Sequence, residues 1–516
     1  MEFIKQEIRN FTWKIKNTMQ FTMDDTVNIS ETHMDMEQLV LVKGNLVVEE
    51  TKALVDRFQI KGYLNYQILY RADKGGSIFD SINGRVPFME YINADGTKET
   101  DYIEVHTSLN DLTVSMLHSR KISIKALIGV DYQVKEYECF QAISDIQEAN
   151  HVKILNGQFS MMGLQQQKTE KIRFNGRVEI PSNKPNIYQV IWKSLSLTGT
   201  STKPADGYIM VNGTLNLFLV YATEDENMPI QYFTVEIPFE QRVNEDMVNE
   251  DMICGGHVNL DTYQIKVMPD ENREDRLVDI VTDMTLELKL YGLEEMNLLQ
   301  DAYSPTEEMN PVWKRFTIQH LLLRNCAKTR IQEVVDMPKA QTILQLCNVE
   351  GSVSIDDTER TENGILVEGV VCAQVTYLNK EEKGSLASVT FDIPFSYEID
   401  VNGMKEDISY SIVPTLDRIN GVQIQENQIE IKAELSLDVL VFTNEKENAV
   451  LDMKVAPIDV EKKRALPCLI GYVVKEGDTL WSIAKQYYTS VETISKINEL
   501  SGDELHAGDK LLIMKE

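Results

Sequence analysis

The sequence predicts a mainly β protein in which three tandem homologous β-rich domains are followed by a small βααβ domain. Three observations carry this prediction. A glycine, a tyrosine and a Pro-Phe pair recur three times at fixed spacing, and each of these units closes with a long run of alternating apolar and polar residues. Residues 471–516 then place two short amphipathic segments between two short strands.

The opening segment, residues 2–21, is compatible with two structures. Apolar side chains lie near helical spacing at Phe3, Ile4, Ile8, Phe11 and Ile15. Residues 11–15, however, also alternate between apolar and polar side chains. A helix and a strand both fit this pattern, and the sequence leaves the choice open.

The internal repeat reads G-x7-Y-x16-P-F in all three copies. It starts at Gly62, Gly213 and Gly369, which lie 151 and 156 residues apart, so the unit has the size of a domain. We expect the glycine to mark a bulge or a close approach of two backbones. The tyrosine is expected to pack with its hydroxyl at the rim, and the phenylalanine to anchor the core. These positions therefore define fold rather than chemistry. The remaining repeat positions are Tyr70, Tyr221, Tyr377, Pro87-Phe88, Pro238-Phe239 and Pro394-Phe395.

Each unit ends in a run with period two, over residues 122–134, 278–290 and 429–441. Alternation of apolar and polar residues over a run of this length predicts a long strand with one buried face. The segments before the second and third tyrosines, 215–221 and 371–377, are also rich in apolar residues and lead into polar turns. Each unit is therefore expected to be a hairpin-rich β domain.

We expect domain boundaries at 1–149, 150–303 and 304–444, a linker at 445–470 and a last domain at 471–516. Ser304-Pro305-Thr306 and Asn310-Pro311 mark the second junction. The linker holds two prolines and the short basic cluster Lys462-Lys463-Arg464, which we interpret as a solvated tether.

In the last domain, a first helix is indicated by Leu480, Ile483, Ala484 and Tyr487, which form one apolar stripe. Gly477-Asp478-Thr479 predicts a tight turn that ends in a helix-capping residue. A second helix is expected from Val491, and a return strand over 510–514.

These residues resemble the LysM domain, a glycan-binding fold. The resemblance rests on Tyr472-Val473-Val474, Gly477-Asp478-Thr479-Leu480, Ile483-Ala484, Ile494, Ile497-Asn498, Leu500, Leu505, Gly508 and Leu511-Leu512-Ile513. It implies a ligand-binding groove, for glycan or protein, formed by Gly477, Asp478, Thr479, Leu480, Ile497, Asn498, Glu499 and Leu500. The alternative is that Asp478 and Thr479 only cap a helix and that Asn498 only ties down a turn. Met514 departs from the family, which usually has proline there.

Tandem β-rich domains that end in one LysM domain resemble the SPOCS-domain proteins of spore-forming Firmicutes. This resemblance implies a non-catalytic role in spore coat assembly at the forespore surface, inside the mother cell. It also implies binding to a coat morphogenetic ATPase similar to SpoIVA and to other coat proteins.

Composition limits the other function classes. A formal net charge of −30 argues against nucleic acid, because a phosphate backbone is held by basic residues. The sequence has no apolar run of about 18 residues, so no transmembrane helix is expected. No secretion signal is expected at the start. Six cysteines without a C-x-x-C pair suit a reducing compartment.

Catalytic and metal-binding motifs are not found. The seven histidines show no H-x3-H or H-E-x-x-H spacing, and neither G-x-S-x-G nor G-x4-G-K-[ST] occurs. We therefore expect no enzyme, cofactor or metal. The first hypothesis is a scaffold that binds the coat ATPase, and the alternative is a peptidoglycan binder that uses its LysM. A hidden glycan hydrolase is a weaker third hypothesis. Because no secretion signal is expected, we favour a protein ligand for the groove.

Overall fold

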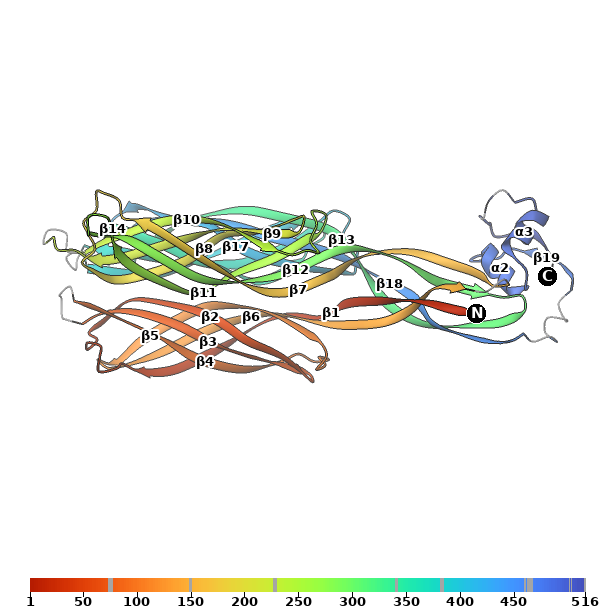
Figure 1. Cartoon of the computed structure of the whole chain (residues 1–516), viewed down its shortest axis with the longest axis horizontal. Helices are drawn as coiled ribbons and strands as arrows, with labels where there is room; N and C mark the ends of the chain where they lie inside the picture. Colours follow the sequence, from red (N-terminus) through yellow and green to blue (C-terminus); the bar gives the residue numbers. More distant parts are fainter. Residues whose placement is uncertain are drawn as a thin grey trace.

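The computed structural model describes residues 1–72, 78–147, 151–225, 230–338, 342–380, 385–458, 461, 467–500, 502 and 504–514. Figure 1 shows an elongated molecule, with β sandwiches at one end that draw out into a narrower stalk of long strands. The C-terminal domain lies at the tip of this stalk, beside the N-terminus.

Six strands build each repeat. Repeat 1 contains β1 (Glu2–Asn28), β2 (Gln38–Leu54), β3 (Arg57–Arg71), β4 (Phe79–Asn93), β5 (Tyr102–His118) and β6 (Lys121–Gln147). Repeat 2 contains β7 (Lys153–Glu179), β8 (Gln189–Ala205), β9 (Tyr208–Ala222), β10 (Ile230–Asn244), β11 (Ile253–Pro269) and β12 (Asp275–Tyr303). Repeat 3 contains β13 (Glu307–Asp336), β14 (Ile343–Arg360), β15 (Gly364–Asn379), β16 (Ser385–Asp400), β17 (Ile408–Gln425) and β18 (Gln428–Pro457).

In every repeat, two three-stranded antiparallel sheets pack face to face. The first, sixth and fifth strands form one sheet in the orders β1-β6-β5, β7-β12-β11 and β13-β18-β17. The second, third and fourth strands form the other sheet, a meander. The alternating runs lie in the central strands β6, β12 and β18, whose inward residues are buried in the sandwich core. The predicted mainly β class is therefore confirmed.

The repeated glycine lies opposite the repeated phenylalanine in the sheet register. Gly62 pairs with Phe88, and a Cβ added to that glycine would lie 2.8 Å from the phenylalanine ring. The same pairing and the same 2.8 Å approach occur in the other two repeats. The expected close approach of a second backbone is confirmed at Gly62 and Gly369, where the added Cβ would lie 2.2 Å from the carbonyl oxygens of Val47 and Ser354. At Gly213 the close neighbours are side chains, the Phe239 ring and Thr200.

The repeated tyrosine is fully buried in each repeat, at Tyr70, Tyr221 and Tyr377. The hydroxyl of Tyr70 donates to the carbonyl of Met34 over 2.8 Å, and that of Tyr221 donates to the carbonyl of Pro185 over 3.2 Å. These two tyrosines therefore tie the connection between the first and second strands to the core of the repeat.

The opening segment is a strand, because β1 pairs with β6 from Glu2 to Asn28. Beyond the sandwiches, the first and last strands of each repeat continue as paired ribbons, and the three ribbons pack together as the stalk. One stalk core draws residues from all six long strands: Ile8, Ala142, Met161, Met296, Leu298, Phe316, Ile318 and Ala449.

Residues 445–457, which we expected to begin the linker, belong to β18 and pair with β13. Ala449, Val450 and Met453 are buried in the stalk, so this segment is held by apolar packing. Most of the remaining linker, with its basic cluster, lies outside the described residues. The other domain boundaries stay predictions.

At the opposite end from the stalk, the three meander sheets meet in a shared apolar cluster that includes Leu41, Trp192 and Cys347. Polar contacts also join the repeats. Gln374 of repeat 3 donates to the Val42 carbonyl of repeat 1 over 2.8 Å. The repeats are therefore packed against one another at both ends.

Candidate functional site in the C-terminal domain

The C-terminal domain has the predicted order of elements. Strand β19 (Leu469–Val473) pairs with β20 (Lys510–Met514), and the helices α2 (Leu480–Gln486) and α3 (Val491–Ile497) lie between them in sequence. Thr479 is the N-cap of α2: its hydroxyl accepts from the backbone N–H of Ser482, and its own N–H donates to the Ser482 hydroxyl. The predicted cap is confirmed.

The apolar members of the candidate groove contribute mainly to the domain core. Leu480 is buried together with Ile483, Ala484 and other apolar residues of both helices and β20. Ile497 and Leu500 are half-buried. The core burial of Leu480 makes this residue structural.

Asp478 is engaged within its own turn. Its carboxylate accepts from the Tyr472 hydroxyl over 2.7 Å and from the backbone N–H of Lys475 over 2.8 Å. These hydrogen bonds hold the pKa of Asp478 below its ordinary value. The bond to the carboxylate in turn raises the pKa of Tyr472 to about 12.

Asn498 joins the second candidate segment to the sheet. Its amide nitrogen donates to the carbonyls of Ile494 and Leu512, each over 2.8 Å, and its amide oxygen accepts from the Leu512 N–H over 2.6 Å. Asp478 is bonded to β19 and Asn498 to β20, so the two segments are tied to neighbouring strands. These contacts agree with the structural alternative for Asp478, Thr479 and Asn498.

Three groove positions are exposed: Gly477, Thr479 and Glu499. Gly477 has φ +86°, is exposed, and has no atom within 4 Å of a Cβ added to it. Glu499 has φ +55° and is also exposed. Both residues are in tight turns of left-handed conformation, where the backbone is accessible to a ligand. Ligand binding by the eight groove residues stays a prediction.

The outer face of the β19–β20 sheet is mainly apolar, with Lys510 as its charged member opposite Val473, and it was missed in the sequence analysis. Leu469, Val473, Leu512 and Met514 are 56%, 54%, 41% and 47% exposed. Residues Leu511 and Ile513 of β20 point into the core instead. This face could have been predicted from the unbroken apolar run 511–514. Alternate residues of a strand point to opposite faces, so such a run leaves apolar side chains on the outer face as well.

The opposite side of the domain rests on the tip of β12. Trp481 Nε1 donates to Asp301 over 2.9 Å, and Lys485 Nζ lies 2.7 Å from the same carboxylate. The Tyr303 ring packs edge-on against Trp481, with centroids 4.8 Å apart. Lys153 of β7 adds an ion pair with Glu492 of 3.1 Å. Helix α2 is therefore docked on the stalk, while the apolar sheet face stays exposed.

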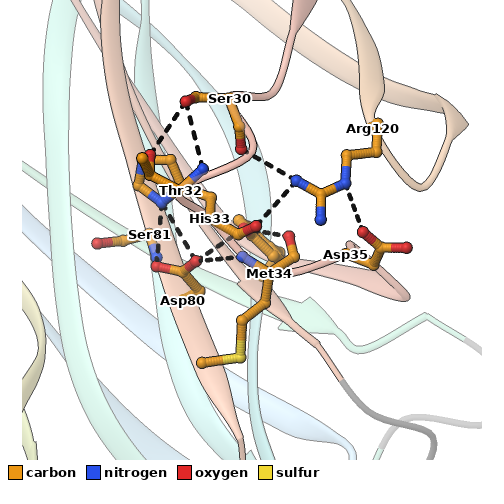
Figure 2. A network of polar contacts seen from close by, with 9 residues as sticks. Ser30, Thr32, His33, Met34, Asp35, Asp80, Ser81 and Arg120 are labelled. Carbon is orange, nitrogen blue, oxygen red and sulfur yellow. Dashed lines mark hydrogen bonds and ion pairs between the residues drawn. The ribbon is translucent and has the colours of Figure 1, made fainter.

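Another polar cluster, at the far end of repeat 1, has a structural role (Figure 2). The carboxylate of Asp80 contacts the His33 ring at 3.2 Å and accepts from the Met34 N–H over 3.0 Å. Burial raises the pKa of Asp80, but these hydrogen bonds outweigh burial and the pKa lies below its ordinary value. Arg120 donates to two carbonyls of the same loop, and Arg276 does so in repeat 2. Both arginines hold the connection between the first and second strands.

Within the described parts of the chain, no group of three or more His, Cys, Asp or Glu side chains is placed to hold a metal ion. No helix in those parts has the length and apolar character needed to cross a bilayer.

Three packed β sandwiches and one docked βααβ domain define a modular tandem-repeat protein. Family models match the chain in four places: the LysM domain at residues 472–513, and the SipL, SPOCS domain at residues 35–117, 186–268 and 342–424. The chain is therefore a SPOCS-domain protein with a C-terminal LysM domain, as its sequence resemblance indicated. No curated protein and no solved structure matches it.

Each SPOCS match spans the second to fifth strands of one repeat. The long first and last strands, which build the stalk, lie outside the matches. SPOCS and LysM are non-catalytic domain families, and they associate the chain with the spore coat or with peptidoglycan.

Proposed function

We propose that this protein is a non-enzymatic scaffold of spore coat assembly that binds a SpoIVA-like coat ATPase through its LysM domain. In this role it acts in the mother cell at the forespore surface. The observation that carries the proposal is the contrast between the two sides of the LysM surface. The side chains of Asp478, Thr479 and Asn498 in the groove bond within the domain, whereas the β19–β20 face offers exposed apolar side chains.

A glycan chain needs hydrogen-bond partners for its hydroxyl and acetamide groups. In this domain, Asp478, Thr479 and Asn498 already bond to the protein itself, so their use by a sugar would break an internal contact. A protein partner is better served by apolar area, since burial of a leucine side chain contributes about 1.5 to 3 kcal/mol.

Docking on the stalk supports the same function. The contacts of Trp481 and Lys485 with Asp301 fix the domain on the side away from the exposed sheet face. A partner that binds this face therefore meets a domain of fixed orientation, and less entropy is lost on binding.

Co-purification of the full-length chain with a SpoIVA-like ATPase tests this proposal. The substitutions Val473→Glu and Leu512→Glu place charge on the exposed face without touching the core, and we expect them to weaken binding by roughly tenfold or more. Val422→Glu is the matched control, because Val422 is 52% exposed in repeat 3. Equal binding by the double variant and the control contradicts the assigned face. Equal binding by a chain that ends at residue 470 contradicts any role of the LysM domain.

Peptidoglycan binding is the second candidate function, and the exposed left-handed turns at Gly477 and Glu499 favour it. These turns leave the backbone of both groove segments open to an N-acetylated sugar. Co-sedimentation with purified insoluble wall glycan tests this candidate. Failure of the intact chain to sediment at micromolar protein excludes it.

A further inference from the structure

The three meander sheets share one backbone plan but present different chemistry on their outward faces. The repeated glycine pairs with the repeated phenylalanine in all three meander sheets, so the sheets have the same register. Outward-facing residues at the same distance in sequence from this glycine or this phenylalanine are therefore equivalent in the three repeats. In repeat 1 these positions form a basic face, defined by Arg57, Lys61, Tyr63, Arg85, Met89 and Tyr91. Its composition is unusual for a chain with a net charge of −30. Lys61 already has a carboxylate partner, since its Nζ lies 3.8 Å from Glu49.

The basic face is arranged for contact. Arg57 lies 5.1 Å from the ring centroid of Tyr91, and Arg85 lies 4.7 Å from that of Tyr63. Met89 and Tyr91 are 53% and 51% exposed. In the described part of the chain, no carboxylate forms an ion pair with either arginine. Stacking on the rings holds both guanidinium groups ready for a carboxylate partner.

Repeat 3 carries the opposite charge at the same positions. Glu368 stands where repeat 1 has Lys61, Asp392 where it has Arg85, and Glu398 where it has Tyr91. These define the acidic face of repeat 3: Glu368, Asp392 and Glu398, all of which are exposed.

Repeat 2 provides a precedent for pairing at this site. Its equivalent residue, Glu236, lies 3.1 Å from Arg418 of repeat 3 within the same chain. A carboxylate at this position of the meander thus already pairs with an arginine of a neighbouring repeat. Apart from the half-buried Tyr63, the residues of the basic face of repeat 1 and of the acidic face of repeat 3 are exposed, so neither face covers the other within one chain.

We propose that the basic face of repeat 1 binds the acidic face of repeat 3 in a second copy of this chain. Arginine, tyrosine and methionine are enriched at interface cores, and opposite charges favour encounter and fix register. Since the two faces differ, the contact is head-to-tail and repeats from copy to copy, giving rings or open filaments.

Sedimentation velocity of the full chain over a concentration series tests this proposal, at about 0.05 M and about 0.5 M salt. The intact chain associates at low salt and dissociates at high salt. Arg57→Glu with Arg85→Glu reverses the basic face, and Asp392→Arg with Glu398→Arg reverses the acidic face. Each pair alone weakens association by roughly tenfold or more.

A mixture of the two reversed proteins restores association, because each face of one then meets an opposite charge on the other. The control is Lys203→Glu with Lys266→Glu, which makes the same charge change as the reversal of the basic face, at exposed positions of repeat 2, and leaves association intact. Circular dichroism confirms folding of every variant. A chain that stays monomeric at low salt overturns the proposal. So does loss of association in only one of the reversed pairs, or failure of the mixture to associate, since either points to a different occupant.

Discussion

Replacement of Asp301 by alanine is expected to release the LysM domain from the stalk. This carboxylate is 18% exposed and receives the Trp481 indole N–H and the Lys485 ammonium. A hydrogen bond to a charged group contributes about 1.5 to 3 kcal/mol, and a partly exposed ion pair about 0.2 to 1 kcal/mol. Because both groups stay partly solvated, we take a combined loss of about 2 kcal/mol, which is about 30-fold in the docking equilibrium.

The chain itself offers a matched control. Asp145 follows the corresponding β-bulge of repeat 1, and it accepts from the N–H of Ile146 as Asp301 accepts from that of Ala302. Asp145 is exposed and has no contact with the LysM domain in the described residues. Asp145→Ala therefore removes the same local hydrogen bond without the docking contact.

Nuclear magnetic relaxation of residues 480–497 measures the outcome, since a docked domain tumbles with the whole chain and a released one tumbles faster. We expect faster tumbling for Asp301→Ala, and wild-type behaviour for Asp145→Ala. The same relaxation in both variants would refute the reasoning that this carboxylate holds the domain.

Two further predictions concern stability. Gly213→Ala places a Cβ 2.8 Å from the Phe239 ring, so we expect a loss of about 1 to 3 kcal/mol in urea unfolding, whereas Gly471→Ala, with no atom within 4 Å, changes little. Burial, and secondly the neighbouring His106, lowers the pKa of His257 to about 4. In the unfolded state this histidine takes up a proton near pH 6.5, whereas in the folded state it stays neutral at that pH. The contribution of neutral His257 to the free energy of unfolding is therefore complete above pH 6.5 and is lost as pH falls towards 4. Urea unfolding at several pH values should show a smaller pH dependence for His257→Gln than for wild type; an unchanged dependence contradicts the assignment.

The stalk gives the proposed scaffold its geometry. Six long strands from three repeats share one apolar core, and the LysM domain is fixed at the end of that core by contacts with β7 and β12. A partner bound to the LysM domain is thereby held at a distance from the sandwiches.

Much of the fold was predictable, because its signals are local. The repeated spacing around Gly62, Gly213 and Gly369 predicted three homologous domains, and the alternating runs predicted the central strands. The stalk was harder to predict. A β-bulge at Leu451 of β18, opposite Val312 and Trp313, shifts the alternation, so residues 445–457 lack the continuous period-two pattern of a strand.

The sequence by itself determined the repeat architecture and the βααβ order of the last domain, since periodicity, capping and turn chemistry depend on residues close together in the chain. Tertiary structure decided how those elements are used. Asp301 and Trp481 are 180 residues apart, and no local pattern brings them together. Tertiary contacts also decide which apolar side chains are exposed. Leu512 is exposed and Leu480 is buried, because burial depends on the residues that the whole fold packs around each side chain.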